Sequence, residues 1–97
     1  GTVYLSGEVA NDLSGDICQQ TRETLANIEG LLDRAGTDKT RVLSATIYLN
    51  DIEAHFAGMN SVWDQWLPKG AAPARATVEA KLAAPGLSVE IMVQAAK

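Results

Sequence analysis

The sequence predicts a single α+β domain with the element order βαβαββ, in which two helices cover one face of a sheet. Two segments repeat apolar residues at helical spacing, and the other segments alternate with the two-residue period of strands. The 97 residues suffice for one domain, residues 1–97, which buries only about 60 to 65% of its unfolded surface when it folds alone. We therefore expect the domain to gain stability from a partner.

Composition narrows the range of partners and compartments. The net charge is −4 at pH 7 and the basic residues are scattered, which disfavours nucleic acid and an anionic membrane surface. No apolar run approaches the ~20 residues of a membrane-spanning helix, and no segment resembles a signal peptide. We expect a soluble, cytoplasmic protein whose single cysteine, Cys18, is a packed core thiol and not a nucleophile.

The residue types that commonly hold metals or phosphates are sparse. His55 is the only histidine, so no histidine pair can form a metal site, and we expect it to face solvent from a helix. No glycine-rich phosphate loop or nucleotide fingerprint occurs. The sequence therefore predicts neither a metal nor an organic cofactor.

The N-terminal segment, residues 2–6, alternates as a short strand. Val3 and Leu5 lie on one side, and the polar side carries Thr2, Tyr4 and Ser6. A strand that begins at residue 2 is abrupt, so we expect a further strand to precede it and to pair with its edge.

The first helix is predicted over residues 16–35. Asp16 followed by Gln19 has the form of a capping box, and Gly36 is a suitable residue just beyond the end. Helical spacing places an apolar stripe on one side, formed by Ile17, Thr21, Leu25, Ile28, Leu32 and Ala35. This stripe is expected to pack on the sheet.

A strand and a second helix follow. Residues 41–50 alternate strictly, with a core side formed by Leu43, Ala45, Ile47 and Leu49. The second helix is predicted over residues 52–67, and Pro68 ends it. One side of that helix carries Ile52, Phe56, Met59, Trp63 and Trp66.

The last two strands are predicted to form a hairpin around Pro85-Gly86, which suits the central positions of a type II turn. Alternation then places Arg75 and Thr77 on the same mixed face as Glu90, and turns Ala74, Ala76, Val78 and Ala80 toward the core. In this register Lys81 faces Glu90, and a cross-strand ion pair is the structural alternative to a functional role for Glu90.

Each strand is thus expected to have one apolar face and one mixed face. Two helices can cover only the apolar face, and the mixed face is too apolar in places to be plain solvent surface. A homo-oligomer that packs mixed faces together would bury aromatic and sulfur atoms and leave polar pockets between chains. The mixed face is predicted to carry Tyr4, Ser6, Ser44, Thr46, Tyr48, Arg75, Thr77, Glu90 and Met92.

Short motifs along the whole chain carry a family resemblance. They are Ser6-Gly7-Glu8, Gln20-Thr21-Arg22, Leu25-Ala26-Asn27-Ile28, Ala35-Gly36, Thr46-Ile47-Tyr48-Leu49-Asn50-Asp51, Met59-Asn60-Ser61-Val62-Trp63, Pro73-Ala74-Arg75 and Val89-Glu90-Ile91. In this order and spacing they resemble the RidA/YjgF family, small proteins that form homotrimers of the chorismate-mutase-like (ferredoxin-like) α+β fold. Glu8 in place of the usual glutamine, and the pair Trp63 and Trp66, indicate a divergent subgroup.

The resemblance implies hydrolytic deamination of reactive enamines and imines, of the 2-aminoacrylate or 2-iminobutanoate type, to 2-ketoacids and ammonia without a cofactor. Arg75 matches the arginine that holds the substrate carboxylate, a role that suits the planar guanidinium fork. Glu90 matches the acidic residue that orients or activates the attacking water. Thr77 stands where many members have cysteine, and near the substrate the resemblance also places Ser6, Gly7 and Asn60.

Two other functions are weighed against deamination. A non-catalytic trimer could bind small carboxylate metabolites at its subunit interfaces, where Arg75 alone would be needed. Ribonuclease activity is disfavoured by the acidic balance and by the lack of a histidine pair. In the hairpin register Arg75 and Glu90 are roughly 20 Å apart along the ladder, so a shared substrate is expected to require Glu90 from a neighbouring subunit.

Overall fold

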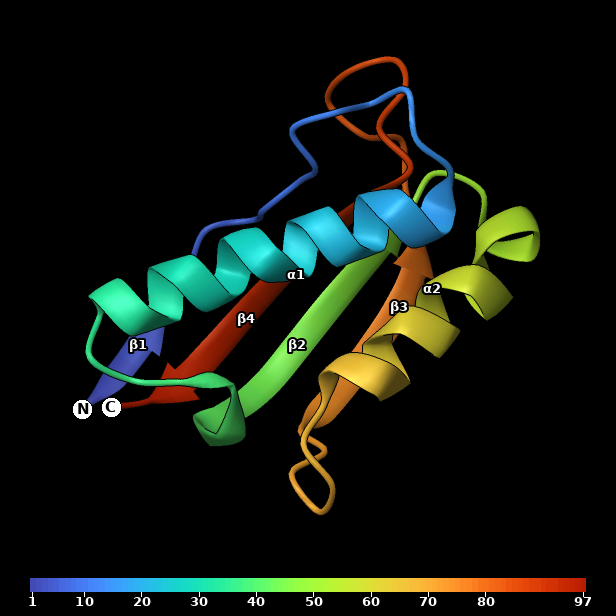
Figure 1. Ribbon diagram of the computed structural model, residues 1–97. Helices are drawn as coiled ribbons and strands as arrows, with labels where there is room; N and C mark the ends of the chain where they lie inside the picture. Colours follow the sequence, from blue (N-terminus) through green and yellow to red (C-terminus); the bar gives the residue numbers. More distant parts are fainter.

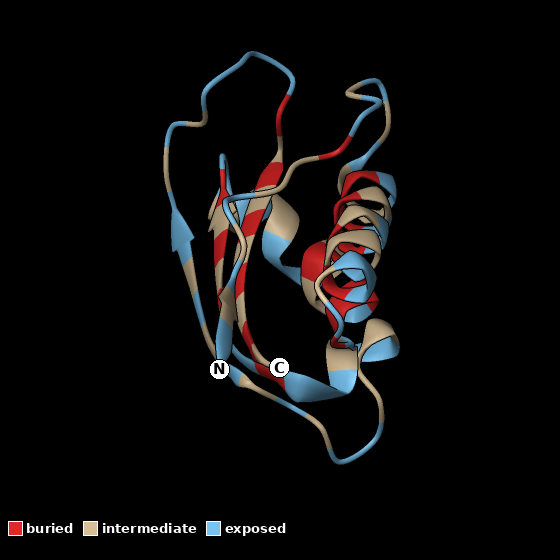
Figure 2. Ribbon diagram, turned by 90° about the vertical axis from the view of Figure 1, so that its left-hand side faces the viewer, coloured by how far each residue is buried: buried red, intermediate tan, exposed pale blue.

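The computed structural model describes residues 1–97 in full and confirms the predicted α+β fold and element order. Both helices lie on one face of a sheet with the strand order β1-β4-β2-β3 (Figure 1). Figure 2 shows the two layers, with no helix over the opposite, open face of the sheet. The elements are β1 (Thr2–Tyr4), α1 (Ile17–Arg34), the short 3-10 helix η1 (Lys39–Arg41), β2 (Val42–Leu49), α2 (Ile52–Trp66), β3 (Ala74–Glu79) and β4 (Val89–Ala96).

Both helices begin and end within a residue or so of the predicted positions. The Asp16 side chain caps α1 by accepting a hydrogen bond from the Gln19 backbone N–H at 2.9 Å, and Gly36 beyond the last turn has a φ of +82°, which favours glycine. Asp51 caps α2 in the same way. Neither helix combines the length and the apolar character needed to cross a membrane.

The core lies between the helices and the sheet, and it contains most of the residues that helical and strand periodicity predicted. Burying each large apolar side chain stabilises the fold by roughly 1.5–3 kcal/mol. The buried set is Leu25, Ile28 and Leu32 from α1, Met59, Val62 and Trp63 from α2, and Val42, Ala45, Ile47, Leu49, Val89, Ile91, Val93 and Ala95 from the sheet.

At the start of β2 the predicted alternation is wrong by one residue. The register with β4 shifts between Val42 and Ser44, so Leu43 is an extra residue of the bulged type. As a result Val42 is buried on the core side, and Leu43, expected in the core, is 52% exposed.

The predicted hairpin between β3 and β4 is also wrong, because β2 lies between these strands. β3 runs parallel to β2, and β4 runs antiparallel to β2 on its other side. The turn at Pro85-Gly86 is present, with a φ of +89° at Gly86 and a hydrogen bond from the Leu87 N–H to the Ala84 carbonyl. It sits inside a longer crossing, residues 80–88, that passes the end of β2.

This topology corrects the predicted faces of β3. Arg75 is level with Ala45 and Thr77 with Ile47, so both polar side chains lie on the helix face of the sheet. Glu90 is level with Tyr48 on the open face, so Arg75 and Glu90 do not share a face, and the predicted Lys81 to Glu90 pair does not form. β3 is an edge strand beneath α2, where polar side chains can meet the helix while small ones, Ala74 and Ala76, stay exposed on the open face.

Candidate functional site

Arg75 lies on β3 beneath α2, and three residues of that helix surround its guanidinium. Nη1 donates to Oδ1 of Asn60 at 2.7 Å, and the guanidinium carbon lies 5.8 Å from the ring centroids of both Phe56 and Trp63. These helix residues follow one another at spacings of about one turn, so a single face of α2 presents all of them. An amide and two aromatic faces together hold the cation in place.

The guanidinium has no carboxylate partner within the chain. The chain's one ion pair within 4 Å joins Lys39 of η1 to Glu29 of α1, at 3.5 Å. Arginine has five N–H donors, and Arg75 makes only the hydrogen bond to Asn60. The remaining donors are suited to an anion from outside the chain, with bidentate geometry for a carboxylate.

Thr77 lies two residues further along β3 on the same face. Its Oγ1 is buried and has no hydrogen-bond partner within the chain. Leaving a buried hydroxyl without a partner costs about 1–3 kcal/mol, so such groups are uncommon and mark sites where a further partner is expected. The structure thus brings together three predicted site residues, Asn60, Arg75 and Thr77.

Glu90 forms a second group with Gly7, on the open face. A Cβ added to Gly7 would overlap Oε2 of Glu90 and would lie 2.9 Å from its Cδ, so the carboxylate occupies the space that a side chain would fill. The segment is held against β4 by a pair of backbone hydrogen bonds between Glu8 and Ile91 at 2.8 and 3.0 Å. Ser6, the third predicted residue at this end, is exposed beside Gly7.

The sheet separates the two groups within one chain. Arg75 is level with Ala45 and hence with Val93, whereas Glu90 is level with Tyr48. The offset is roughly 10 Å along the strands and roughly 10 Å across two strand spacings, and the side chains point to opposite faces. The predicted separation of about 20 Å between Arg75 and Glu90 along a β3 to β4 ladder was wrong, because β3 and β4 do not pair. Even so, one small molecule cannot contact both side chains of the same chain.

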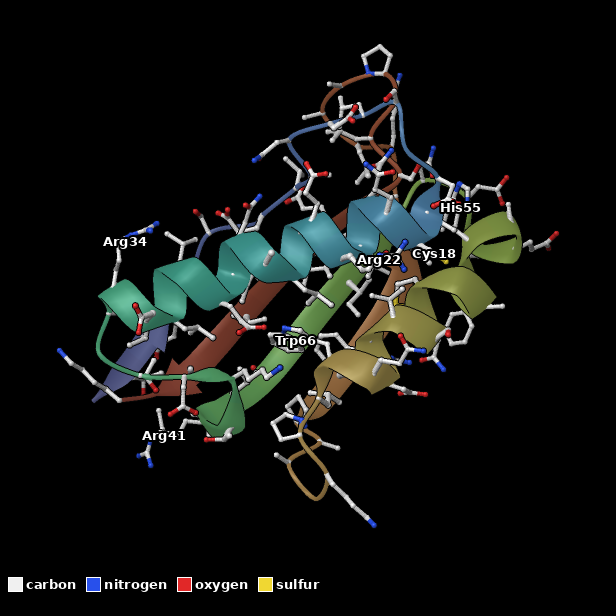
Figure 3. The ribbon with its side chains drawn as sticks, viewed as in Figure 1. Cys18, Arg22, Arg34, Arg41, His55 and Trp66 are labelled. Carbon is white, nitrogen blue, oxygen red and sulfur yellow. The ribbon has the colours of Figure 1, made fainter.

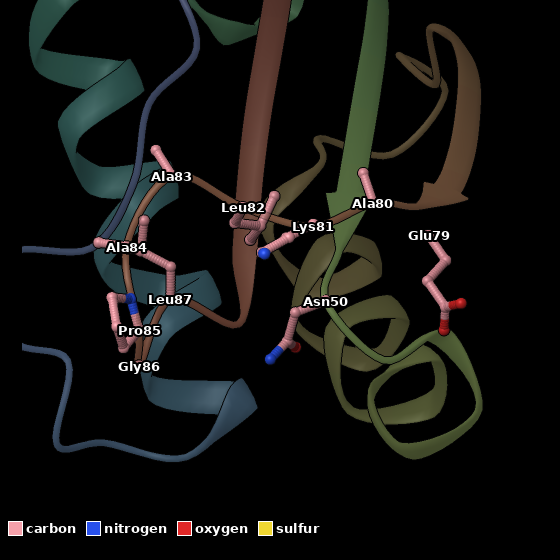
Figure 4. A pocket seen from close by; sticks show the side chains of 10 residues that line it. All are labelled: Asn50, Glu79, Ala80, Lys81, Leu82, Ala83, Ala84, Pro85, Gly86 and Leu87. Atoms are coloured by element: carbon pink, nitrogen blue, oxygen red, sulfur yellow. The ribbon is translucent and has the colours of Figure 1, made fainter.

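The largest hollow of the chain lies elsewhere, at the ends of β2 and β3. It has a volume of about 590 Å³, and Figure 4 shows the side chains of Asn50 and Lys81 reaching into the same space. None of the six predicted site residues lines it. Its walls come from the crossing, and its lining residues are Asn50, Glu79, Ala80, Lys81, Leu82, Ala83, Ala84, Pro85, Gly86 and Leu87.

The two tryptophans of α2 have different surroundings. Trp63 is buried and faces Arg75, whereas the Nε1–H of Trp66 donates to Oε1 of Glu29 at 2.6 Å and so ties α2 to α1. The sequence grouped Trp63 and Phe56 with the core stripe and did not predict their contact with Arg75. Their spacing around Asn60 on one helix face was the signal that could have indicated it.

Other titratable and reactive groups lie apart from both site groups. Hydrogen bonds from Ser14 lower the pKa of Asp12, and hydrogen bonds from Thr40 lower the pKa of Asp38, each within a local turn. Cys18, predicted to be a packed core thiol, is half-buried and packs against the core, with Sγ 3.7 Å from the Gly58 carbonyl oxygen. His55, predicted to face solvent, is half-buried.

No cluster of basic residues or of metal ligands is present. Figure 3 shows Arg22, Arg34 and Arg41 at separate places on the molecule. No three side chains among the histidine, cysteine, aspartate and glutamate residues come together in a group that could hold a metal ion.

A protein-family model and known proteins match this sequence over almost its whole length. The model of the family described as endoribonuclease L-PSP matches residues 1–97. Over 96 residues the chain is 44% identical to a RutC family protein of Haemophilus ducreyi, covering 99% of this chain and 81% of that protein. Over 95 residues it is 44% identical to the RutC family protein YoaB of Escherichia coli, covering 98% and 82% of the two.

Solved structures agree in fold as well as in sequence. A crystal structure of a protein from Pseudomonas aeruginosa matches with a TM-score of 0.94 and 51% identity, covering 99% of this chain and 83% of that chain. A YjgF family member from Neisseria meningitidis matches with a TM-score of 0.95 and 46% identity, covering 100% and 80%. Since the family model matches residues 1–97 and relatives of 44% identity cover 98–99% of this chain, the chain belongs to the RidA/YjgF family.

Proposed function

We propose that this protein hydrolyses reactive enamines and imines of small 2-amino acids to 2-ketoacids and ammonia, in sites formed between the subunits of a homotrimer. The observation that carries the proposal is the Arg75 guanidinium, which is held by Asn60 and two aromatic rings and has no carboxylate partner in its own chain. A positioned cation with unused donors is what a small carboxylate substrate requires.

Assembly would complete the site. The open face carries exposed apolar side chains, with Tyr4 72% and Val78 43% exposed, and contact with a second copy would cover them. If the open face of one chain meets the β3 edge of the next, where Arg75 lies beneath α2, Glu90 and Gly7 of one chain would approach Arg75 of the other, which a single chain cannot do. The trimer itself is tested by sedimentation equilibrium, and a monomer mass at micromolar concentration would overturn it.

In the proposed reaction Arg75 holds the substrate carboxylate and Glu90 acts on water. An enamine first takes a proton on its terminal carbon and becomes the protonated imine. Water then adds to the imine carbon while its proton passes to Glu90, which gives a carbinolamine. Glu90 returns the proton to nitrogen, the carbon–nitrogen bond breaks with its electron pair leaving on ammonia, and the hydroxyl loses its proton to give the ketoacid.

The neighbouring residues would orient the substrate. Asn60 keeps the guanidinium fork in place, and the unpartnered Thr77 hydroxyl is suited to a hydrogen bond with a bound polar group. Ser6 and Gly7 would border the substrate on the Glu90 side. Thr77 replaces the cysteine of many relatives, so the proposed chemistry needs no thiol at this position.

A coupled assay tests the proposal. A pyridoxal-dependent dehydratase generates the enamine in place, and ketoacid release is followed with and without this protein. We expect acceleration by the wild-type protein and by Arg34→Lys, a control at an exposed arginine, and none by Glu90→Gln, which should still bind a 2-ketoacid. Release that the wild-type protein does not accelerate would overturn the proposal.

The second candidate is a non-catalytic trimer that binds small carboxylates, because Arg75 is complete as an anion site without Glu90. It predicts ketoacid binding by the wild-type protein without any turnover. The name of the matching family also suggests ribonuclease activity. The net charge of −4 and the scattered arginines argue against that reading here.

A further inference from the structure

Gln20 is a buried polar side chain whose hydrogen bonds all leave its own helix. It is 1% exposed in α1. Its Nε2 donates to the carbonyls of Gly86 at 2.9 Å and Gly15 at 3.2 Å, with a longer contact to Leu13 at 3.4 Å. Its Oε1 accepts from the Ser88 N–H at 2.9 Å. One amide therefore joins α1 to the loop before it and to the crossing that leads into β4.

The contacts to Gly86 and Ser88 clamp the crossing on both sides of buried Leu87. Ser88 is the last residue before β4, and its carbonyl accepts from the Asn50 N–H at the end of β2 at 3.2 Å. Gln20 and Asn50 thus both bond to the residue at which the chain enters β4. Glu90 is the second residue of that strand.

The Glu90 carboxylate makes no hydrogen bond to any group in the chain, so its position depends on the backbone of β4 and on its tight contact with Gly7. We propose that Gln20 is a positioning residue for Glu90: by clamping Gly86 and Ser88 from the buried side of α1, it holds the β4 backbone where the Glu90 carboxylate lies against Gly7. Its consequence for catalysis rests on the proposed function.

The test compares Gln20→Leu with a matched control in the same helix. Thr21 is also fully buried, but its hydroxyl donates to the Ile17 carbonyl of its own helix at 2.7 Å, so Thr21→Val removes a buried hydrogen bond without touching the crossing. We expect Gln20→Leu to lower kcat at least about tenfold, because small misplacements of catalytic groups are costly, while ketoacid affinity at Arg75 stays within about twofold. Thr21→Val should change neither quantity by as much.

If Gln20→Leu does not fold, Gln20→Asn replaces it, because the shorter amide keeps a polar group but cannot reach both Gly86 and Ser88. A wild-type kcat in the Gln20 variant would overturn the proposal, as would equal losses of kcat and affinity, which would indicate a general structural role.

A second readout keeps the positioning role separate from the proposed reaction. Backbone amide chemical shifts of Gly7 and Glu90, and hydrogen exchange at the Ser88 amide, report the local geometry whether or not the protein is an enzyme. They should change in the Gln20 variant and not in Thr21→Val. Unchanged shifts and exchange in the Gln20 variant would overturn the role of Gln20. If these signals change in the variant but the wild-type protein has no deaminase activity, only the proposed function is overturned.

Discussion

The Arg75 group and the Glu90 group are built in different ways. Arg75 is placed by side chains, an amide and two aromatic rings on one face of α2. Glu90 is placed by backbone: the Gly7 segment, which leaves space for the carboxylate, and the start of β4, which Gln20 ties to α1. We therefore expect changes near Arg75 to act on ligand affinity, and changes near Glu90 to act on turnover.

The largest expected effect concerns the separation of the groups by the sheet. If each site takes Arg75 from one chain and Glu90 from another, Arg75→Ala and Glu90→Gln chains should each be inactive alone and should regain activity when they exchange into mixed trimers. Some interfaces would then carry both wild-type residues. The measurement is ketoacid release in the coupled assay before and after subunit exchange, with each variant exchanged against itself as the control. Mixed trimers of verified composition without activity would contradict an intersubunit site.

A second prediction tests whether the space beside the Gly7 backbone positions the Glu90 carboxylate. Gly7→Ala places a methyl group where the Glu90 carboxylate lies, and the carboxylate can swing away because it is the end of a flexible side chain. We expect turnover to fall at least about tenfold through displacement of the carboxylate, with little loss of stability. The control is Gly30→Ala on α1, where the nearest atom would be 3.7 Å from the new Cβ. Wild-type turnover in Gly7→Ala would show that the carboxylate position does not matter.

These predictions depend on strand neighbours, which periodicity alone could not supply. The helices, the Asp16 cap of α1 and most core residues followed from the sequence, because a 3.6-residue period and a capping aspartate are local signals. The register of β3 did not follow. Strand alternation places Arg75 and Thr77 on the same face of β3. The small alanines on the other face did not indicate which of the two faces α2 covers. The Pro85-Gly86 turn was predicted correctly, yet a turn does not show that the strands around it pair.

The site residues themselves came from the family resemblance, and the structure added how they are grouped. Neither contact of Arg75 with Phe56 and Trp63 could be read from the strand pattern, because these residues are far from Arg75 in sequence. The close approach of Glu90 to Gly7 depends on the pairing of the N-terminal segment with β4, a long-range feature. Local patterns thus predicted the elements well, whereas tertiary pairing determined which of the candidate side chains lie together.

A third, smaller effect tests the side-chain placement of Arg75. Arg75→Lys keeps the charge but loses the planar fork and its contact with two rings, so ketoacid affinity should fall by about 1 to 3 kcal/mol while the fold is retained. Isothermal titration with a 2-ketoacid measures this change, and Arg34→Lys on the exposed end of α1 is the control. Unchanged affinity in Arg75→Lys would make Arg75 a structural residue.

The smallest expected effect concerns the unpartnered Thr77 hydroxyl, and it separates a site residue from an ordinary buried threonine. Thr77→Val removes a buried hydroxyl that has no partner, so the free energy of unfolding should rise, by up to about 1 kcal/mol, since replacing an unsatisfied group relieves its desolvation cost. Thr24 in α1 is also buried, but its hydroxyl donates to the Gln20 carbonyl at 2.7 Å, so Thr24→Val should instead lower that free energy by about 1 kcal/mol. Urea unfolding at one protomer concentration compares the two variants, because assembly makes apparent stability depend on concentration.

If a ligand completes the Thr77 hydrogen bond, ketoacid affinity should fall in Thr77→Val even as the unliganded protein becomes more stable. Destabilisation of both variants alike would mean that Thr77 is satisfied in the free protein and that its hydroxyl is not kept for a ligand.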